Sequence, residues 1–292
     1  MTGRVSRGAW LAYAVVAGLV AALALLKWGQ AVALAGPVLY GEGAVAHAAI
    51  LTRTLATYSD AGGSAFTAAN YPPLYFLLAS VGDPFVTGRV LSVLATLAIA
   101  ILVAWRARPG GRLAAAALGL GWLALSPVAI WGPAVKPDLV ALALTVGAVL
   151  ALERRRSGFA AVLLVLAMTT KPTAIVPAIA LLVWIVWRDR RMLRPFVVAG
   201  AAAAAVAAIA LVPFGYSDVW RHVVGWNALP WTAESALLLG VIGVVVLAAL
   251  LGGALVSRGF AGPIAAYAVA GLAIVALGGR EGATINYLLD LA

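Results

Sequence analysis

The segment GRVLSVLATLAIAILVAWRARPGGRLAAAALGLGWLALSP, residues 88–127, decides the class of fold. Two apolar runs flank a short basic turn, RARPGGR at residues 106–112. A helix needs about 20 apolar residues to cross a bilayer, and basic residues collect in the loops on the cytoplasmic side. The segment therefore predicts one membrane helix, a cytoplasmic turn and a second membrane helix.

The composition extends this interpretation to the whole chain. Mean hydropathy over the 292 residues is +1.06, and 10% of residues are charged, whereas a soluble domain has about 25%. The net charge of +10 comes from short arginine clusters between apolar runs, which indicates membrane topology and argues against nucleic acid as a partner. The absence of cysteine excludes disulfides and thiolate metal sites. We therefore expect an all-α polytopic membrane protein.

The alternation of apolar runs and basic clusters predicts a bundle of about nine transmembrane helices, in a single domain over residues 1–292 with no soluble domain. The expected spans are residues 10–28, 86–105, 113–131, 138–152, 158–170, 172–187, 195–213, 235–256 and 260–277. With a cytoplasmic N-terminus in a cell (plasma or inner) membrane, this count leaves every basic cluster inside. These clusters are Arg4 with Arg7, residues 106–112, 154–156 and 188–194, and Arg258. The stretch ALAG (33–36) resembles a signal-peptidase site, but the apolar run before it is long enough for a retained helix.

The first outer loop, residues 29–85, contains an apolar stretch that is too short to cross. Leu74–Val81 has eight residues and follows the pair Pro72–Pro73. As a helix it would cover about 12 Å, and proline is tolerated in the first turn of a helix. We predict a juxtamembrane or re-entrant helix here.

The same loop contains the favoured catalytic residue. Glu42 lies between Gly41 and Gly43 in YGEG, a setting that permits close approach by a ligand. A carboxylate there can act as general base on a hydroxyl; the alternative is that its charge only favours the start of a helix. His47 follows on that helix but does not share the face of Glu42 closely.

Eight of the ten acidic residues and most isolated cations fall on the predicted outer side. Ionisable residues close to the bilayer raise a functional hypothesis. Lys136 and Lys171 lie in outer turns next to predicted spans that are short. Either these turns lie in a water-filled recess below the outer surface, or the bilayer is locally thinner around the short spans. The outer set is Glu42, His47, Asp60, Asp83, Arg89, Lys136, Asp138, Lys171, Arg221, His222, Arg280 and Glu281.

Several members of this set have a simpler explanation. Asp60 and Asp83 are expected in turns, and Arg221 with His222 suits an interfacial position. Glu42, Asp138 and His47 include oxygen and nitrogen ligands for a divalent cation, but no spacing requires a metal, so no cofactor is assigned.

The order YGEG, YPPLYFLL, GRVLSVL, KPDLVAL, TKPTAIVP and INYLLDL resembles that of the GT-C superfamily of membrane glycosyltransferases. The nearest type is the family 39-like one of protein-mannosyltransferases and aminoarabinose transferases, and the likeness covers essentially the whole chain. It implies transfer of a sugar, with inversion, from a polyprenyl-phosphate donor to a lipid, glycan or protein hydroxyl on the outer face of the membrane.

The resemblance also implies roles for particular residues. Glu42 matches the acid of the first outer loop, although Gly41 stands where relatives often have aspartate, and Asp138 matches the second acidic position. GGREGATINYLLDLA (278–292) resembles the start of a further span, so we expect a fragment or a short form. The expected catalytic pair is Glu42 and Asp138; the expected phosphate ligands are Lys136, Lys171, Arg89 and Arg280; and the expected substrate contacts are His47, Tyr71, Tyr75, Asn286 and Tyr287.

The residues leave alternatives open. Lys136 and Arg89 suit snorkelling to the interface, and Tyr71, Tyr75 and Trp131 suit interfacial anchoring as well as stacking on a sugar. A transporter or lipid-linked-sugar flippase is the rival function, but it would be expected to carry midplane polar residues in paired halves. A non-catalytic scaffold would make Glu42 replaceable.

Overall fold

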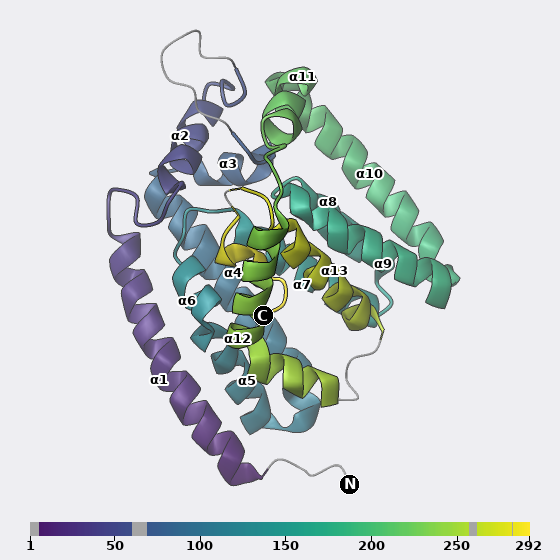
Figure 1. Ribbon diagram of the computed structural model, residues 1–292. Coiled ribbons are helices and arrows are strands. Elements are labelled where there is room, and N and C mark those ends of the chain that lie inside the picture. Colours follow the sequence, from purple (N-terminus) through teal and green to yellow (C-terminus); the bar gives the residue numbers. More distant parts are fainter. Residues whose placement is uncertain (1–5, 60–68, 257–261, 282) are drawn as a thin grey trace.

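The computed structural model describes residues 6–59, 69–256, 262–281 and 283–292, with side chains left out for 246–256. The described residues form helices and contain no β-strand (Figure 1), which confirms the all-α class. Arg4, Asp60 and Arg258 lie outside the described residues. The helices are α1 Arg7–Val32, α2 Glu42–Thr52, α3 Pro73–Ala79, α4 Pro84–Ala107, α5 Arg112–Ala124, α6 Ser126–Trp131, α7 Asp138–Glu153, α8 Ser157–Met168, α9 Ile175–Arg188, α10 Leu193–Leu211, α11 Tyr216–Trp220, α12 Ala233–Val256 and α13 Pro263–Leu277.

Each predicted span coincides with helical structure, and the number of crossings stays a prediction. Among the described residues, the segments Arg7–Val32, Pro84–Gly110 and Arg190–Phe214 are long and apolar enough to cross a membrane. One expectation is corrected: 113–131 is not one helix but two, because α5 ends at Ala124 and Leu125 is extended, with ψ 133°. The reason is Pro127, whose ring and missing amide proton cannot be accommodated inside a continuous helix.

The helices pack in an order that differs from their order along the chain. α1 packs on α5, α5 on α4, α4 on α7, α7 on α8, and α8 on α10, while α13 packs on α9 and α7. One core cluster joins α1, α5 and α7 through Trp28, Trp122 and Leu139. A second joins α8 to α9 through Leu164 and Leu181. Burial of apolar side chains therefore ties the N-terminal and central helices into one bundle.

The segment predicted as the first outer loop folds into the short helices α2 and α3. The short helix predicted after the proline pair is confirmed as α3, which begins at Pro73 with Pro72 as its N-cap. Its position relative to the membrane stays a prediction. Asp83 caps α4 by accepting hydrogen bonds from the amides of Phe85 and Val86. Aspartate is a preferred residue at this position, so Asp83 has a local structural role.

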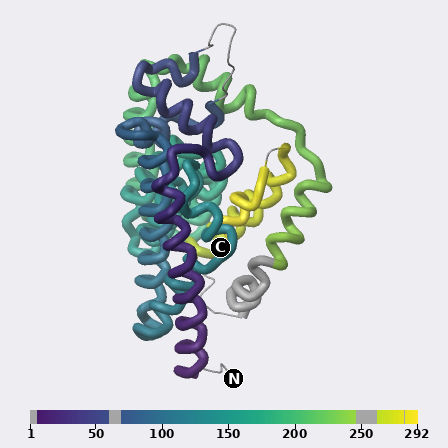
Figure 2. Tube along the Cα trace, turned by 90° about the vertical axis from the view of Figure 1, so that its left-hand side faces the viewer, coloured from purple at the N-terminus to yellow at the C-terminus, as the bar shows by residue number. Residues whose placement is uncertain are grey.

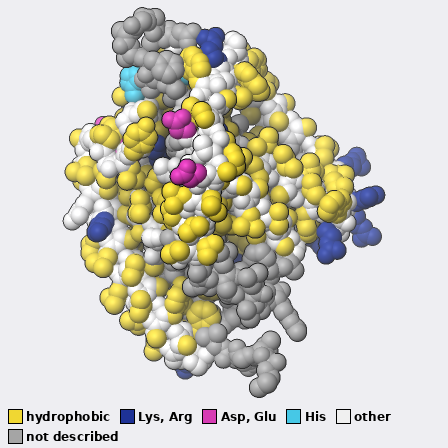
Figure 3. All heavy atoms as spheres, viewed as in Figure 1, with side chains coloured by type: hydrophobic (Ala, Val, Ile, Leu, Met, Phe, Trp, Pro, Cys, Tyr) yellow, Lys and Arg dark blue, Asp and Glu magenta, His cyan; other side chains and the backbone are white. Residues whose placement is uncertain are grey.

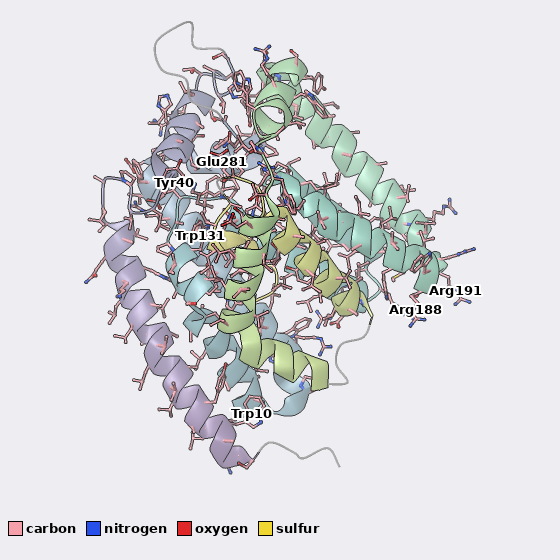
Figure 4. All side chains as sticks on the ribbon, in the orientation of Figure 1. Trp10, Tyr40, Trp131, Arg188, Arg191 and Glu281 are labelled. Atoms are coloured by element: carbon pink, nitrogen blue, oxygen red, sulfur yellow. The ribbon has the colours of Figure 1, made fainter. Side chains whose placement is uncertain are left out.

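The basic loops gather at one end of the bundle. Arg106 pairs with Glu153 at 2.9 Å, so the ends of α4 and α7 and the basic loops that follow them meet at one end. Figure 3 shows basic side chains gathered at the right-hand edge, where Figure 4 labels Arg188 and Arg191. The first residues of α4 and α7 therefore lie at the opposite end, which is where the candidate site residues gather.

The C-terminal segment lies between the main bundle and α12, as Figure 2 shows in yellow. Leu239 of α12 and Val275 of α13 enclose Leu288 from the 3-10 turn Ile285–Leu288. An antiparallel bridge between Trp231 and Arg280 joins the start of α12 to the end of α13. This packing brings residues 280–287 beside the turns that precede α7 and α9.

Candidate active-site cavity

A cavity of about 610 Å³ lies where α2, the turns before α7 and α9, and the C-terminal segment meet. Its volume falls within the range of about 300–1,000 Å³ that small-molecule sites occupy. Tyr40, Trp131 and Glu281 line it from three separate parts of the chain, and Figure 4 shows them around one region. Of the residues expected at the site, it is lined by Lys136, Lys171, Arg280, Tyr71, Asn286 and Tyr287.

The cations of the cavity differ in their partners. The Lys171 ammonium lies 2.7 Å from Oδ1 of Asp138, and both residues are buried. The same oxygen accepts a hydrogen bond from the Asn286 amide at 2.7 Å. The Lys136 ammonium forms no ion pair or hydrogen bond with another described residue. Burial lowers its pKa, and the charges of Asp138 and Glu42 offset only part of this effect. The Lys136 ammonium is therefore open to an anionic ligand.

Gly41 makes room for Lys136. Its φ is +75°, in the left-handed region, and a Cβ there would lie 2.6 Å from the Lys136 nitrogen. Only glycine combines that backbone conformation with the absence of a side chain. The position of the Lys136 ammonium, and not that of the Glu42 carboxylate, thus explains why residue 41 is glycine.

Arg280 is held by a chain of polar contacts around the cavity. Its Nη2 donates to Oδ1 of Asn227 at 2.6 Å, and the Asn227 amide donates to the backbone oxygen of Asn70 at 3.2 Å. The backbone of the segment is fixed as well, because the Thr232 amide donates to the carbonyl of Gly279 at 2.8 Å. These contacts join three distant parts of the chain at one wall.

Three buried side-chain atoms in this wall have no hydrogen-bond partner among the described residues. They are Oδ1 of Asn70, Nε1 of Trp131 and Nε of Arg280, and all three residues line the cavity. A buried polar atom without a partner costs about 1–3 kcal/mol. Such atoms concentrated at one cavity are the pattern expected where a polar ligand binds.

Glu42 occupies a different setting. Its Oε1 accepts from the Val135 amide at 2.8 Å, and its Oε2 accepts from Arg89 at 3.0 Å. The amides of Val38 and Leu39 also donate to Oε2. Burial alone would raise the pKa of Glu42, but the hydrogen bonds from backbone amides and from Arg89 outweigh it and hold the pKa below its ordinary value. The side chain is fully buried and does not line the cavity.

The structure also sets three other expected site residues apart from the cavity. Arg89 is fully buried, and its guanidinium donates to the carbonyls of Leu34 and Gly36 as well as to Glu42. Tyr75 is buried with its hydroxyl on the carbonyl of Gly88. His47 is exposed on α2 and is not part of the lining.

A separate small pocket of about 10 Å³ lies behind the Asp138–Lys171 pair. Oδ2 of Asp138 has no partner among the described residues, and Asp290 and Thr145 line the same pocket. Its size is that of about one water molecule. Within the described ranges, no three His, Cys, Asp or Glu side chains form a group suited to a metal ion, so Glu42, Asp138 and His47 do not converge as ligands.

Sequence reasoning did not assign Asn70, Asn227 or a role for Glu281. Asn70 directly precedes the YPPL stretch, and Glu281 follows Arg280, so adjacency to expected site residues was the available signal. Asn227 gave none, because only the tertiary fold brings residues 70, 227 and 280 together.

The model of glycosyltransferase family 87 matches residues 66–284, three quarters of the chain. The match includes Lys136, Lys171, Arg280 and Glu281, and Glu42 lies before it. The likeness to family 39-like enzymes is not confirmed by this match. No curated protein and no protein of solved structure matches the chain.

Proposed function

The chain belongs to glycosyltransferase family 87, a GT-C-type family of membrane glycosyltransferases, and from this membership we propose a specific reaction. The enzyme moves a hexose or pentose from a polyprenyl-phosphate donor to a hydroxyl acceptor, with inversion at the sugar. The observation that carries the proposal is the presence of Lys136, Lys171 and Arg280 around one cavity beside apolar helices. A lipid phosphate is a ligand whose charge matches these cations and whose tail matches the surrounding membrane.

The cations suit the bond that breaks. As the sugar leaves, its former carrier becomes a phosphate with one more negative charge, and fixed positive charges nearby lower the barrier. Lys136 offers an ammonium without a partner among the described residues, and Arg280 offers a planar guanidinium that binds phosphate oxygens. Asp138 keeps Lys171 in place at 2.7 Å.

The proposed location of the cavity is the outer face of the membrane. The basic loops meet at the opposite end of the bundle, where the Arg106–Glu153 pair lies. Basic loops face the cytoplasm in most membrane proteins, so the cavity end would face outward. A polyprenyl-phosphate sugar and its acceptor would meet there.

Glu42 has a positioning role in this proposal. Its Oε1 accepts from the amide of Val135, the neighbour of Lys136, and so it orders the turn that carries this lysine. To act as the catalytic base that the sequence suggests, the fully buried Glu42 side chain would first have to become accessible from the cavity, which it does not line. Holding the turn requires no such rearrangement.

The test is turnover of a panel of short-chain polyprenyl-phosphate hexoses and pentoses by the purified chain in lipid vesicles, with a set of alkyl glycosides supplied as hydroxyl acceptors. Free polyprenyl phosphate and labelled glycoside are measured. We expect one donor to react, and Lys136→Met to reduce turnover on the order of a hundredfold. Lys27→Met is the matched control, because Lys27 lines a separate groove along α1, and it should keep wild-type turnover.

Two results would contradict the proposal. Equal turnover in Lys136→Met and Lys27→Met would contradict the proposal that the cavity binds the donor's phosphate. Movement of an intact labelled donor across sealed vesicles without release of polyprenyl phosphate would instead support the flippase alternative.

A further inference from the structure

Building on the proposed function, we propose that Glu281 forms the acceptor-hydroxyl site and receives the proton of the attacking hydroxyl. Glu281 lines the cavity and is exposed to it. Among the described residues, it is the one Asp or Glu that lines this cavity. Asp138 lines the small pocket behind Lys171, and Glu42 lines the separate groove along α1.

Access to the cavity, together with free carboxylate oxygens, separates Glu281 from the buried acids. Both oxygens of Glu42 accept hydrogen bonds, and Oδ1 of Asp138 accepts two. Oδ2 of Asp138 has no partner among the described residues, but Asp138 is buried and lines the small pocket rather than the cavity. Within the described chain, no hydrogen bond or ion pair involves the Glu281 carboxylate. A general base must have an oxygen free to approach the hydroxyl within about 2.6–3.2 Å. Glu281 meets this requirement without rearrangement.

The backbone of Glu281 is fixed even though its side chain is free. Its amide donates to the carbonyl of Pro230 at 2.9 Å, and the preceding residue, Arg280, forms the bridge with Trp231. Gly279 allows this close contact, because a Cβ there would lie 2.6 Å from the carbonyl of Thr232. The carboxylate is therefore attached to a backbone segment that hydrogen bonds hold in place.

Polar atoms suited to a sugar's hydroxyls lie around the same cavity. Oδ1 of Asn70 can accept a hydrogen bond and Nε1 of Trp131 can donate one, and neither has a partner among the described residues. Together with Glu281, they give the cavity one donor and two acceptor groups beyond its cations. This set matches a polyol, so the inferred ligand class is a hydroxyl-bearing acceptor.

The step balances with the groups named. The acceptor oxygen attacks the anomeric carbon, and the bond from that carbon to the phosphate oxygen breaks. The electron pair leaves with the phosphate, whose added negative charge the cavity-lining Lys136 and Arg280 would stabilise. The hydroxyl proton passes to the Glu281 carboxylate and then to water.

The experiment compares Glu281→Gln with Glu234→Gln. Glu234 is an exposed carboxylate at the start of α12 and does not line the cavity. For each variant in vesicles, binding of polyprenyl phosphate and release of polyprenyl phosphate from the reactive donor are measured. We expect Glu281→Gln to bind the lipid phosphate like the wild type and to lose turnover about a hundredfold or more. Glu234→Gln should match the wild type in both measurements.

A rescue experiment separates proton transfer from packing. Added formate should restore part of the turnover of Glu281→Ala, because a small carboxylate can occupy the space of the missing one, and it should not restore Lys136→Met. Wild-type turnover in Glu281→Gln, or loss of its phosphate binding together with turnover, would overturn the inference alone. Absence of turnover in the wild type with every donor would overturn the proposed function and this inference with it.

Discussion

The Glu42–Arg89 and Asp138–Lys171 pairs are both buried ion pairs, yet their surroundings differ. Every oxygen of Glu42 has a hydrogen-bond partner, and the pair ties the start of α2 to α4. Asp138 has one oxygen without a partner among the described residues, and its lysine lines the large cavity. A fully satisfied pair fixes architecture, whereas a pair with open atoms beside a cavity is suited to a ligand.

The largest expected effect comes from breaking the satisfied pair. Glu42→Ala leaves Arg89 buried without its anion, which costs about 3–5 kcal/mol of the free energy of unfolding. Thermal unfolding in lipid vesicles or detergent checks this. Arg155→Ala is the control, since the Arg155–Asp189 pair is exposed and such pairs contribute about 0–1 kcal/mol. Equal loss in the two variants would contradict the contrast between buried and exposed pairs.

The second prediction uses ligand rescue to separate the two buried pairs. Asp138→Asn also leaves a buried cation, Lys171, but that cation lines the cavity where a phosphate can bind. We expect polyprenyl phosphate to raise the melting temperature of Asp138→Asn more than that of the wild type, because a ligand stabilises the state that it binds. In Glu42→Gln the same lipid should give no added rise. An equal rise in melting temperature for both variants would contradict the distinction between a ligand-binding pair and a structural pair.

The third prediction compares the two glycines around Glu42. Gly41→Ala introduces a Cβ 2.6 Å from the Lys136 nitrogen at a φ of +75°, so it should destabilise the fold by about 1–2 kcal/mol and weaken phosphate binding. Gly43→Ala has open space within 4 Å and lies in α2, where alanine is favoured by about 0.5–1 kcal/mol. Unfolding and phosphate-binding measurements on both variants check this. Similar behaviour of the two would show that Gly41 does not position Lys136.

The smallest effect concerns pH. Burial lowers the pKa of Lys136 from 10.5, and a bound phosphate favours the charged ammonium. Phosphate affinity should therefore fall as the pH rises through this lowered pKa, at a lower pH than for an exposed lysine. Lys136→Arg should remove this part of the fall, because arginine stays charged. Titration of polyprenyl phosphate binding across alkaline pH checks it; identical curves for both proteins would contradict the assignment.

Hydropathy and charge predicted the helices well, because the period and length of apolar runs are local properties. The pairing partners of the expected site residues could not be predicted in this way. The sequence placed Arg89 among phosphate ligands, but tertiary packing puts its guanidinium on the carbonyls of Leu34 and Gly36. Likewise, the convergence of Asn70, Asn227 and Arg280 depends on contacts between residues 157 and 53 positions apart in the sequence. Single-sequence reasoning finds charged residues near a membrane surface, but it does not show which are already satisfied.

The most direct test of the phosphate assignment is a cryo-electron microscopy structure of the chain with polyprenyl phosphate bound. We predict that the phosphate lies within hydrogen-bond distance of Lys136 and Arg280, with Glu42 still paired to Arg89. A phosphate in the groove along α1 beside Lys27, or one that displaces Arg89 from Glu42, would contradict it.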